Sequence, residues 1–262
     1  YLYTLPSCVD DRDYAITHVI RGEDHVTNTA VQIELFAAIG GAAPQFAHHS
    51  LLIGADGEGL SKRLGSLTIE GLRESGVEAS AVTSLLARLG TSEPVVPERS
   101  LAALAEGFSF ADAGRAPARF DDAELRALSA KILHETPYDD VRERLTPLDV
   151  SADLWAAVRG NVATLEEAAD WRAVVDGAID PVIEDEAVTA AAADLVPDGP
   201  LTEDSWSPFV DAVKGATGAK GKKLFMPLRL ALTGVARGPE MAPLFAMIGA
   251  DKARARLRGE RA

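Results

Sequence analysis

The stretch ITHVIRGEDHVTNT, residues 16–29, decides the fold of the amino-terminal part of the chain. An apolar strand runs into an arginine, a polar turn follows, and a helix begins where Thr27, Asn28 or Thr29 can cap its first N–H groups. Apolar residues give this helix a mainly apolar side before Gly40-Gly41 ends it: Val31, Ile33, Leu35, Phe36 and Ile39. The order predicts an α/β unit.

Arg21 stands at the carboxyl end of the predicted strand. In open α/β sheets ligands bind just outside these strand ends, so Arg21 is placed to hold an anionic substrate. The alternative is that Arg21 pairs with Glu23 or Asp24 and only fixes the turn. Spacing alone leaves both interpretations open.

The segment DGEGLSKR, residues 56–63, follows a second apolar strand, Leu51–Ile53. Its glycines let the backbone approach a ligand closely, and Lys62 and Arg63 supply positive charge suited to phosphate oxygens. A basic pair in a loop is also commonly a solvated surface feature. We expect His48 and His49 to be turn residues ahead of this strand.

Together these segments resemble a known family. The run HVIRGEDHVTNT, with VDD before it and AHHSLLIGADGEGLSKR after it, is similar to bacterial glutamyl-tRNA synthetases, and GLSKR resembles the KMSKS-type signature of class I aminoacyl-tRNA synthetases. The closing stretch GKKLFMPLRLALTGVARGPEMAPLFAMIGADKARARL resembles the last helices of the same family. The resemblance thus covers both ends of the chain.

The resemblance implies two sets of substrate-binding residues. The glutamate pocket would use Tyr3, Ser7 and Arg21. The ATP site would use a nucleotide contact, a strand residue and the signature loop: Asp24, Leu52, Gly59, Leu60, Ser61, Lys62 and Arg63. One departure is Gly59, because the family commonly has a lysine there, so Lys62 must supply more of the phosphate-facing charge.

The implied reaction has two steps. The α-carboxylate of L-glutamate attacks the α-phosphorus of ATP in line, with Lys62 as the catalytic residue stabilising the departing pyrophosphate and Mg²⁺ accompanying the ATP. A ribose hydroxyl at the 3′ end of tRNA(Glu) then attacks the adenylate. Neither step needs a side-chain nucleophile or a protein-bound metal, so we interpret Cys8 as a strand or core residue.

The sequence lacks a HIGH-type motif, the element that completes the ATP site in this class. The nearest string, Ala47-His48-His49-Ser50, has the wrong spacing and leads into a strand. The sequence also begins at Tyr1, within an expected strand and without methionine. We therefore expect the carboxyl-terminal portion of a longer protein, inactive by itself. The alternatives are a tRNA-binding remnant, a glutaminyl-tRNA synthetase, or a shortened paralogue that modifies a tRNA base; GEDH and the long helical region argue against the last two.

Composition fits a globular cytoplasmic protein. The 262 residues are 47% apolar and include one cysteine, and no run of about eighteen apolar residues predicts a membrane span. The net charge of −14 is unusual for an RNA-binding protein. Basic residues nevertheless cluster near the end, at Lys220 to Lys223 and again at Lys252 to Arg261. Each cluster is interpreted either as an RNA-facing surface or as solvated helix.

Beyond Arg63 the pattern is mainly helical, which predicts a mainly α chain with an α/β remnant. The expected order is the end of a Rossmann-like catalytic domain over residues 1–75, a helical stem-contact region over 76–146, and a helical anticodon-binding domain over 147–262. Trp155, Trp171 and Trp206 are expected to pack between helices. The expected helices are Ala79–Leu89, Leu101–Glu106, Asp122–Leu133 with Asp121 as cap, Tyr138–Leu145, Ala152–Val158, Leu165–Val174, Asp185–Asp194, Asp204–Thr217, Phe225–Leu232 and Met241–Ile248.

Overall fold

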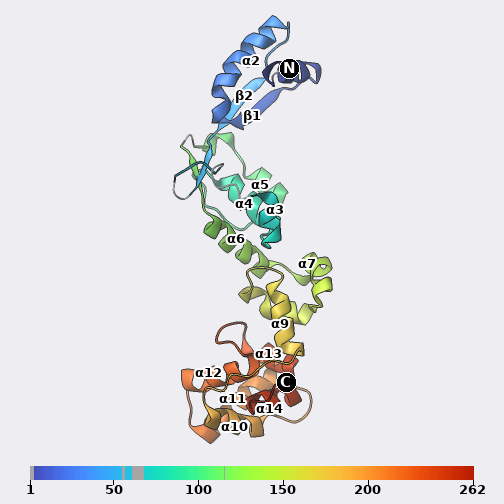
Figure 1. The fold of residues 1–262 in the computed structure, drawn as a ribbon, viewed down its shortest axis with the longest axis vertical. Helices are drawn as coiled ribbons and strands as arrows, with labels where there is room; N and C mark the ends of the chain where they lie inside the picture. The colour runs from blue at the N-terminus through green and yellow to red at the C-terminus, as the bar shows by residue number, and fades with distance from the viewer. Residues whose placement is uncertain (1–2, 55–56, 61–67, 115) are drawn as a thin grey trace. The chain divides into compact units, whose positions relative to one another are not determined.

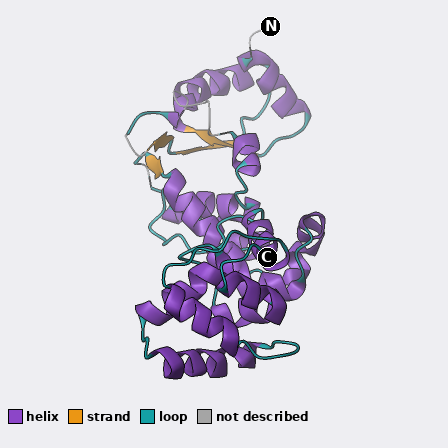
Figure 2. Cartoon of the chain, turned by 60° about the horizontal axis from the view of Figure 1, so that its bottom comes forward, coloured by secondary structure: helices purple, strands orange, loops and turns teal. Residues whose placement is uncertain are grey.

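The computed structural model describes residues 3–54, 57–60, 68–114 and 116–262. Two compact units make up the chain, Tyr1–Leu128 and Ser129–Ala262 (Figure 1). Helices dominate, and the strands of the described residues all belong to the first unit (Figure 2). The predicted fold class, mainly α with an α/β remnant, is confirmed. No helix among the described residues is both long enough and apolar enough to cross a bilayer.

The first unit contains two small parallel sheets. Strand β1 (His18–Gly22) pairs with β2 (Gln45–His49), and β3 (Leu52–Gly54) pairs with β4 (Ala118–Phe120). Because parallel strands need a crossover connection, helix α2 (Val26–Ala38) returns the chain from β1 to β2. The strand–turn–helix order predicted from residues 16–29 is therefore confirmed, and Arg21 lies one residue before the end of β1.

The remaining elements of the first unit are helical. A 3₁₀ turn, η1, precedes α2, and another, η3, precedes β4. Their bounds are α1 (Thr4–Asp13), η1 (Glu23–His25), α3 (Ile69–Glu74), α4 (Ala79–Arg88), α5 (Leu101–Glu106), η3 (Phe110–Asp112) and α6 (Asp122–Glu135), the last of which contains the boundary between the units. Asp121 accepts a hydrogen bond from the Ala123 N–H at 2.8 Å, which confirms it as the cap of α6.

Several local predictions for the first unit are wrong. Residues near the start form helix α1 instead of a strand. Cys8 belongs to that helix and is buried, so its expected core position is confirmed although the strand is not. The two histidines expected in a turn, His48 and His49, belong to strand β2. Helix α2 begins at Val26, earlier than its predicted caps, because the η1 turn leads directly into it.

The inward face of α2 also differs from the prediction. Its buried residues are Thr29, Gln32 and Phe36, whereas Val31 and Ile33 are 47% and 48% exposed in the described part of the chain. The spacing of three and four residues is helical, but two of the three buried side chains are polar. They are buried because they hydrogen-bond to neighbouring elements, as the site below shows.

The second unit is helical throughout. Its bounds are α7 (Tyr138–Leu145), η4 (Thr146–Leu148), α8 (Ala152–Val158), η5 (Arg159–Asn161), α9 (Glu167–Asp176), α10 (Glu186–Leu195), η6 (Glu203–Ser205), α11 (Trp206–Thr217), α12 (Lys222–Thr233), α13 (Met241–Ile248) and α14 (Ala250–Leu257). The predicted bounds of α7, α8 and α13 are confirmed. One continuous apolar core joins these helices, with Trp155 fully inside and Trp171 and Trp206 packed against it, as expected for packing residues.

The basic cluster at the carboxyl end is not simply a solvated helix. Arg256 of α14 is 0% exposed, and Lys252 and Arg254 donate to backbone carbonyls of other helices. Its charges therefore serve the packing of the unit.

Gly238 shows where close packing dictates a residue. Its φ of +149° lies outside the region that other residues readily adopt, and a Cβ there would lie 2.1 Å from a ring carbon of Trp171. Gly238→Ala is therefore expected to lower the free energy of unfolding by about 2–3 kcal/mol, through strain and overpacking. Gly215→Ala in α11 is the control, because no atom lies within 4 Å of the added Cβ and alanine favours helix. Equal urea midpoints for the two variants would contradict this reading of the contact.

Candidate functional site

Arg21 is the centre of a polar network in the first unit. Its Nη2 donates to Thr29 Oγ1 at 2.6 Å and to Gln32 Oε1 at 2.5 Å, both on α2. The guanidinium carbon lies 5.5 Å from the ring centre of Phe46 on β2, a cation–π distance. Arg21 forms no ion pair with Glu23 or Asp24, so the alternative in which it only fixes the turn is wrong.

The network extends on both sides of Arg21. Gln32 Nε2 donates to Ser7 Oγ on α1 at 3.0 Å, and His48 Nε2 lies 2.8 Å from Thr29 Oγ1. Thus β1, β2, α1 and α2 all contribute to one group of hydrogen-bonded side chains. Two of the predicted glutamate-pocket residues, Ser7 and Arg21, are brought together by this network.

Part of the Arg21 guanidinium has no partner among the described residues. Its Nε is buried without a hydrogen bond, and Nη1 makes none to the described part of the chain. A cation with donors left over, at the carboxyl end of a parallel strand, is suited to bind a carboxylate.

The other predicted contacts in the first unit are more exposed. Tyr3, 61% exposed, precedes the first turn of α1, and Asp24 lies in η1 with a carboxylate oxygen 3.7 Å from His25 Nε2. Leu52 begins β3 and lines an apolar cavity of about 320 Å³. Among the described residues, the hydrogen bonds of Arg21 go to Thr29 and Gln32 and not to any of these three.

The signature loop is described only at its start. Gly59 forms an antiparallel bridge with Ile53, and the Gly54 N–H donates to the Glu58 carbonyl at 2.7 Å, so the chain turns back on β3 before Leu60. The predicted ATP contacts Ser61, Lys62 and Arg63 lie outside the described residues.

Sequence reasoning missed Thr29, Gln32 and His48 as site residues. The available signal was the set of polar residues at positions 29 and 32, which share a helical face with Phe36. A polar pair on the same face as an aromatic residue indicates partners on the element beneath, and here that element carries Arg21.

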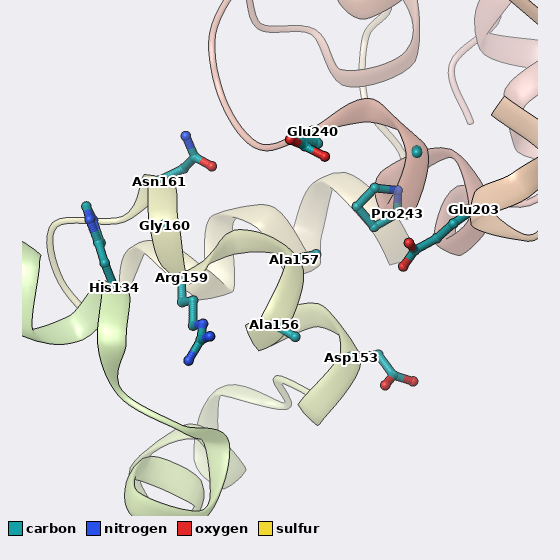
Figure 3. Close-up of a pocket in the computed structure, with 11 residues that line it drawn as sticks. His134, Asp153, Ala156, Ala157, Arg159, Gly160, Asn161, Glu203, Glu240 and Pro243 are labelled. Carbon is teal, nitrogen blue, oxygen red and sulfur yellow. The ribbon is translucent and has the colours of Figure 1, made fainter. Parts of the chain in front are cut away.

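The second unit carries a polar cavity of about 510 Å³ (Figure 3). Donor groups come from His134, Arg159 and Asn161. Carboxylates come from Asp153, Glu203 and Glu240. In Figure 3 Asn161 and His134 lie at one side of the cavity and Glu203 at the other. Three carboxylates would repel a phosphate, so the lining suits a neutral polar group such as a nucleobase better than a phosphate.

A second hollow of about 370 Å³ shares Glu240 and Ala242 with this cavity. It is lined by Trp206, Phe225 and Arg229 among others. Phe225 is 49% exposed, and Lys222 and Lys223 precede it on α12. An exposed aromatic ring beside cations is the arrangement that stacks a base while attracting the nucleic-acid backbone.

Arg229 has an unsatisfied group at this hollow. Its Nη2 donates to the Pro239 carbonyl at 2.6 Å, while Nη1 is buried without a partner among the described residues. Burial lowers the pKa of Arg229 below its ordinary value. An acceptor atom from a ligand would remove this cost.

A metal site is not evident in the described residues, where no group of three or more His, Cys, Asp or Glu side chains could hold an ion. Cys8 packs in α1 with its thiol 3.9 Å from the Gln32 carbonyl, and burial raises its pKa. That shift keeps the thiol protonated, which suits a packing role.

Two family models match the chain. Residues 2–122 match the catalytic domain of the class I tRNA synthetases (E and Q), and residues 150–260 match an anticodon-binding domain. Over its whole length the chain is 53% identical to glutamate–tRNA ligase 2 of Methylorubrum populi, and it covers 59% of that protein. It is 54% identical, again over its whole length, to glutamate–tRNA ligase 1 of Maricaulis maris and covers 60% of it.

The solved structures agree on the fold. A crystal structure of a glutamate tRNA ligase from Elizabethkingia meningosepticum, in complex with its amino acid, matches 98% of this chain with a TM-score of 0.82 at 22% identity. The glutamate-tRNA synthetase of Elizabethkingia anophelis matches with a TM-score of 0.80. The present chain spans 59% of each of these two solved proteins. It spans 59% and 60% of the two curated relatives.

Proposed function

The chain belongs to the family of class I tRNA synthetases of the E and Q type, and on this premise we propose that the protein is a glutamate–tRNA ligase. It activates L-glutamate with ATP and transfers the glutamyl group to the 3′ end of tRNA(Glu). The observation that supports this most directly is the Arg21 network, because it leaves a cation with free donors at the carboxyl end of β1. Since tRNA charging serves translation, we place the protein in the cytoplasm.

The negative charges of the two substrates explain why the first step requires cationic side chains. Glutamate carries two carboxylates and ATP carries several phosphate charges, so a site that holds both must contain fixed cations. In our proposal Arg21 binds a carboxylate of glutamate, with Tyr3 and Ser7 completing the pocket. Asp24, Leu52 and residues 59–63 contact ATP, and Lys62 stabilises charge on the departing pyrophosphate.

Mg²⁺ enters this proposal with the nucleotide. The ion prefers phosphate oxygens and water to a cage made only of protein groups, so ATP itself supplies its main ligands. When bound, Mg²⁺ offsets phosphate charge.

The second unit is the proposed tRNA-binding part. Residues 150–260 match an anticodon-binding domain, and the two hollows that share Glu240 and Ala242 lie within this range apart from His134. We propose that anticodon-loop bases enter these hollows, one beside Phe225 and Arg229. We also propose the three-part organisation over residues 1–75, 76–146 and 147–262. No observation favours a tRNA-binding remnant without catalysis.

The direct test uses the full-length protein that contains these 262 residues, because the chain spans 59–60% of its curated relatives and is expected to be inactive by itself. It measures glutamate-dependent exchange of pyrophosphate into ATP with tRNA present, followed by charging of tRNA(Glu) with labelled glutamate. Exchange that requires L-glutamate, and that L-glutamine does not support, is the expected result. Exchange driven equally by glutamine, or none with a correctly folded protein, would contradict the proposal.

Arg21→Ala is expected to raise the KM for glutamate by roughly 10-fold to 100-fold, because a charge-assisted hydrogen bond is lost. The KM for ATP should stay within about twofold, since no phosphate contact is removed. Exchange kinetics at saturating tRNA measure both constants. Arg12→Ala is a control, since Arg12 is an exposed arginine of α1 whose side chain pairs with Asp13. An unchanged glutamate KM in Arg21→Ala would remove this residue from the pocket.

Phe225→Ala is expected to weaken tRNA binding by about 1–3 kcal/mol, the range typical for one lost stacking contact with a base. Filter binding at fixed ionic strength measures the effect, because protein–RNA affinity depends steeply on salt. The KM for glutamate at saturating tRNA should not change. Val235→Ala is the matched control, since Val235 is likewise an exposed apolar residue of this unit. Equal tRNA affinity of the two variants would contradict base stacking at Phe225.

A further inference from the structure

Gln32 is a buried amide that joins two residues of the glutamate pocket. Its side chain is 2% exposed, with Oε1 accepting from Arg21 Nη2 at 2.5 Å and Nε2 donating to Ser7 Oγ at 3.0 Å. Arginine has only donors, so the oxygen of the amide must face Arg21 and the nitrogen must face Ser7. The orientation of Gln32 is therefore fixed by its partners.

Ser7 is held in turn by its own helix. Its hydroxyl donates to the Thr4 carbonyl at 3.0 Å and accepts from Gln32. A hydroxyl has one proton and two lone pairs, so one acceptor position of Ser7 remains. Gln32 thereby sets both the place and the hydrogen-bonding character of Ser7.

Thr29 holds the same guanidinium nitrogen from one turn earlier on α2. Thr29 Oγ1 accepts from Arg21 Nη2, donates to the His25 carbonyl at 3.2 Å, and lies 2.8 Å from His48 Nε2. Because its single proton is donated to that carbonyl, the threonine hydroxyl accepts a hydrogen bond from His48 Nε2. Both N–H groups of Nη2 are thus used within the protein, which leaves Nη1 and the buried, unpaired Nε of Arg21 as the donors open to a ligand.

The partners of Arg21 are uncharged side chains. Gln32 and Thr29 fix its direction through neutral acceptors, so the positive charge is not cancelled by a carboxylate. A glutamate at position 32 could make the same contact with Arg21, but it would form an ion pair that competes with the substrate carboxylate. Neutral acceptors give orientation while leaving the charge for the ligand.

We propose that Gln32 and Thr29 are positioning residues for the amino-acid substrate: they hold Nη2 of Arg21, leave its other donors for a carboxylate of glutamate, and couple Arg21 to Ser7. Neither residue touches the substrate. This inference rests on the proposed function, because it specifies how the pocket recognises glutamate.

The test uses the full-length protein that contains these 262 residues, with tRNA, in the exchange assay. Gln32→Met keeps the approximate length of the side chain and removes both hydrogen bonds, so the KM for glutamate should rise roughly 10-fold or more. Gln32→Glu adds the competing charge, and its glutamate KM should rise by roughly 100-fold. The KM for ATP should stay within about twofold in both variants. Gln45→Met and Gln45→Glu are the matched controls, since Gln45 is an exposed residue of β2, and they should leave both constants unchanged.

Thr29 gives a second, independent comparison in case the Gln32 variants fold poorly. Thr29→Ser keeps the hydroxyl and should retain the wild-type glutamate KM, whereas Thr29→Val keeps the shape and should raise it by roughly 10-fold. A purely structural role would lower the thermal midpoint in both Gln32 variants without moving the glutamate KM relative to the ATP KM.

The outcomes separate the two levels of the proposal. Wild-type exchange that depends on glutamate, with glutamate KM unmoved in Gln32→Met, Gln32→Glu and Thr29→Val, would overturn the positioning role and leave the ligase function in place. A folded wild-type protein without glutamate-dependent exchange would overturn the function, and this inference with it.

Discussion

Replacing Lys62 by alanine in the full-length protein is expected to slow the proposed formation of glutamyl-adenylate by roughly 100-fold to 1,000-fold, the range seen when one group that stabilises transition-state charge is removed. The reason is the departing pyrophosphate, which gains charge as its bond to the α-phosphorus breaks. Gly59 stands where the family commonly has a second lysine, so Lys62 has less support in the loop. The rate of ATP–pyrophosphate exchange at saturating substrates measures the effect.

The binding of tRNA provides the comparison for Lys62. The affinity for tRNA should change by less than about threefold in Lys62→Ala, since a single charge contributes little to a large interface. Lys62→Arg keeps the charge and should recover part of the exchange rate, although the wider guanidinium alters the geometry. A parallel loss of exchange and tRNA affinity in Lys62→Ala would show that the residue acts in RNA binding instead.

Much of the helical architecture could be predicted because its signals are local. Proline and glycine residues separate the helices of the second unit, and side-chain caps mark the first turns of α8 and α10. Ser151 accepts from the Leu154 N–H, and Asp185 accepts from the Val188 N–H. The predictions that failed depend on contacts distant in sequence. Helix α1 and strand β2 were misassigned because their conformation is decided by packing against α2 and by pairing with β1.

The site was predicted in part for the same reason. Arg21 could be located from the order strand, arginine, turn, helix. Its partners could not be located in this way, because they are distant in sequence. Gln32 lies 11 residues from Arg21, and His48 joins the network through Thr29, which lies 19 residues before it. The apolar count along α2 favoured Val31 and Ile33 as its inner face, whereas the half-buried Arg21 hydrogen-bonds to polar residues of this helix. The need to pair this cation therefore changed which face of an amphipathic helix turns inward.

Arg256 of the second unit belongs to the basic cluster at the carboxyl end, yet its side chain is fully buried. Its Nε, Nη1 and Nη2 donate to the carbonyls of Ala262, Leu232 and Gly177 at 2.8, 2.8 and 2.9 Å. Leu232 is in the last turn of α12 and Gly177 follows α9, so the cation lies where two helices leave carbonyls unpaired. Burial lowers the pKa of Arg256, but an arginine stays charged at neutral pH.

Arg256→Met is therefore expected to lower the free energy of unfolding of the second unit by about 3–5 kcal/mol, because three hydrogen bonds to buried or part-buried carbonyls are lost at once. Arg258→Met is the matched control two residues further along the chain: the Arg258 side chain is 53% exposed, and its ion pair with Asp194 spans 3.3 Å. An exposed pair of this kind contributes at most about 1 kcal/mol. Urea unfolding followed by tryptophan fluorescence measures both variants, since all three tryptophans belong to this unit. Equal urea midpoints for Arg256→Met and Arg258→Met would show that water replaces Arg256 at these carbonyls. If Arg256→Met were stable but bound tRNA more weakly, Arg256 would instead belong to the RNA-binding surface.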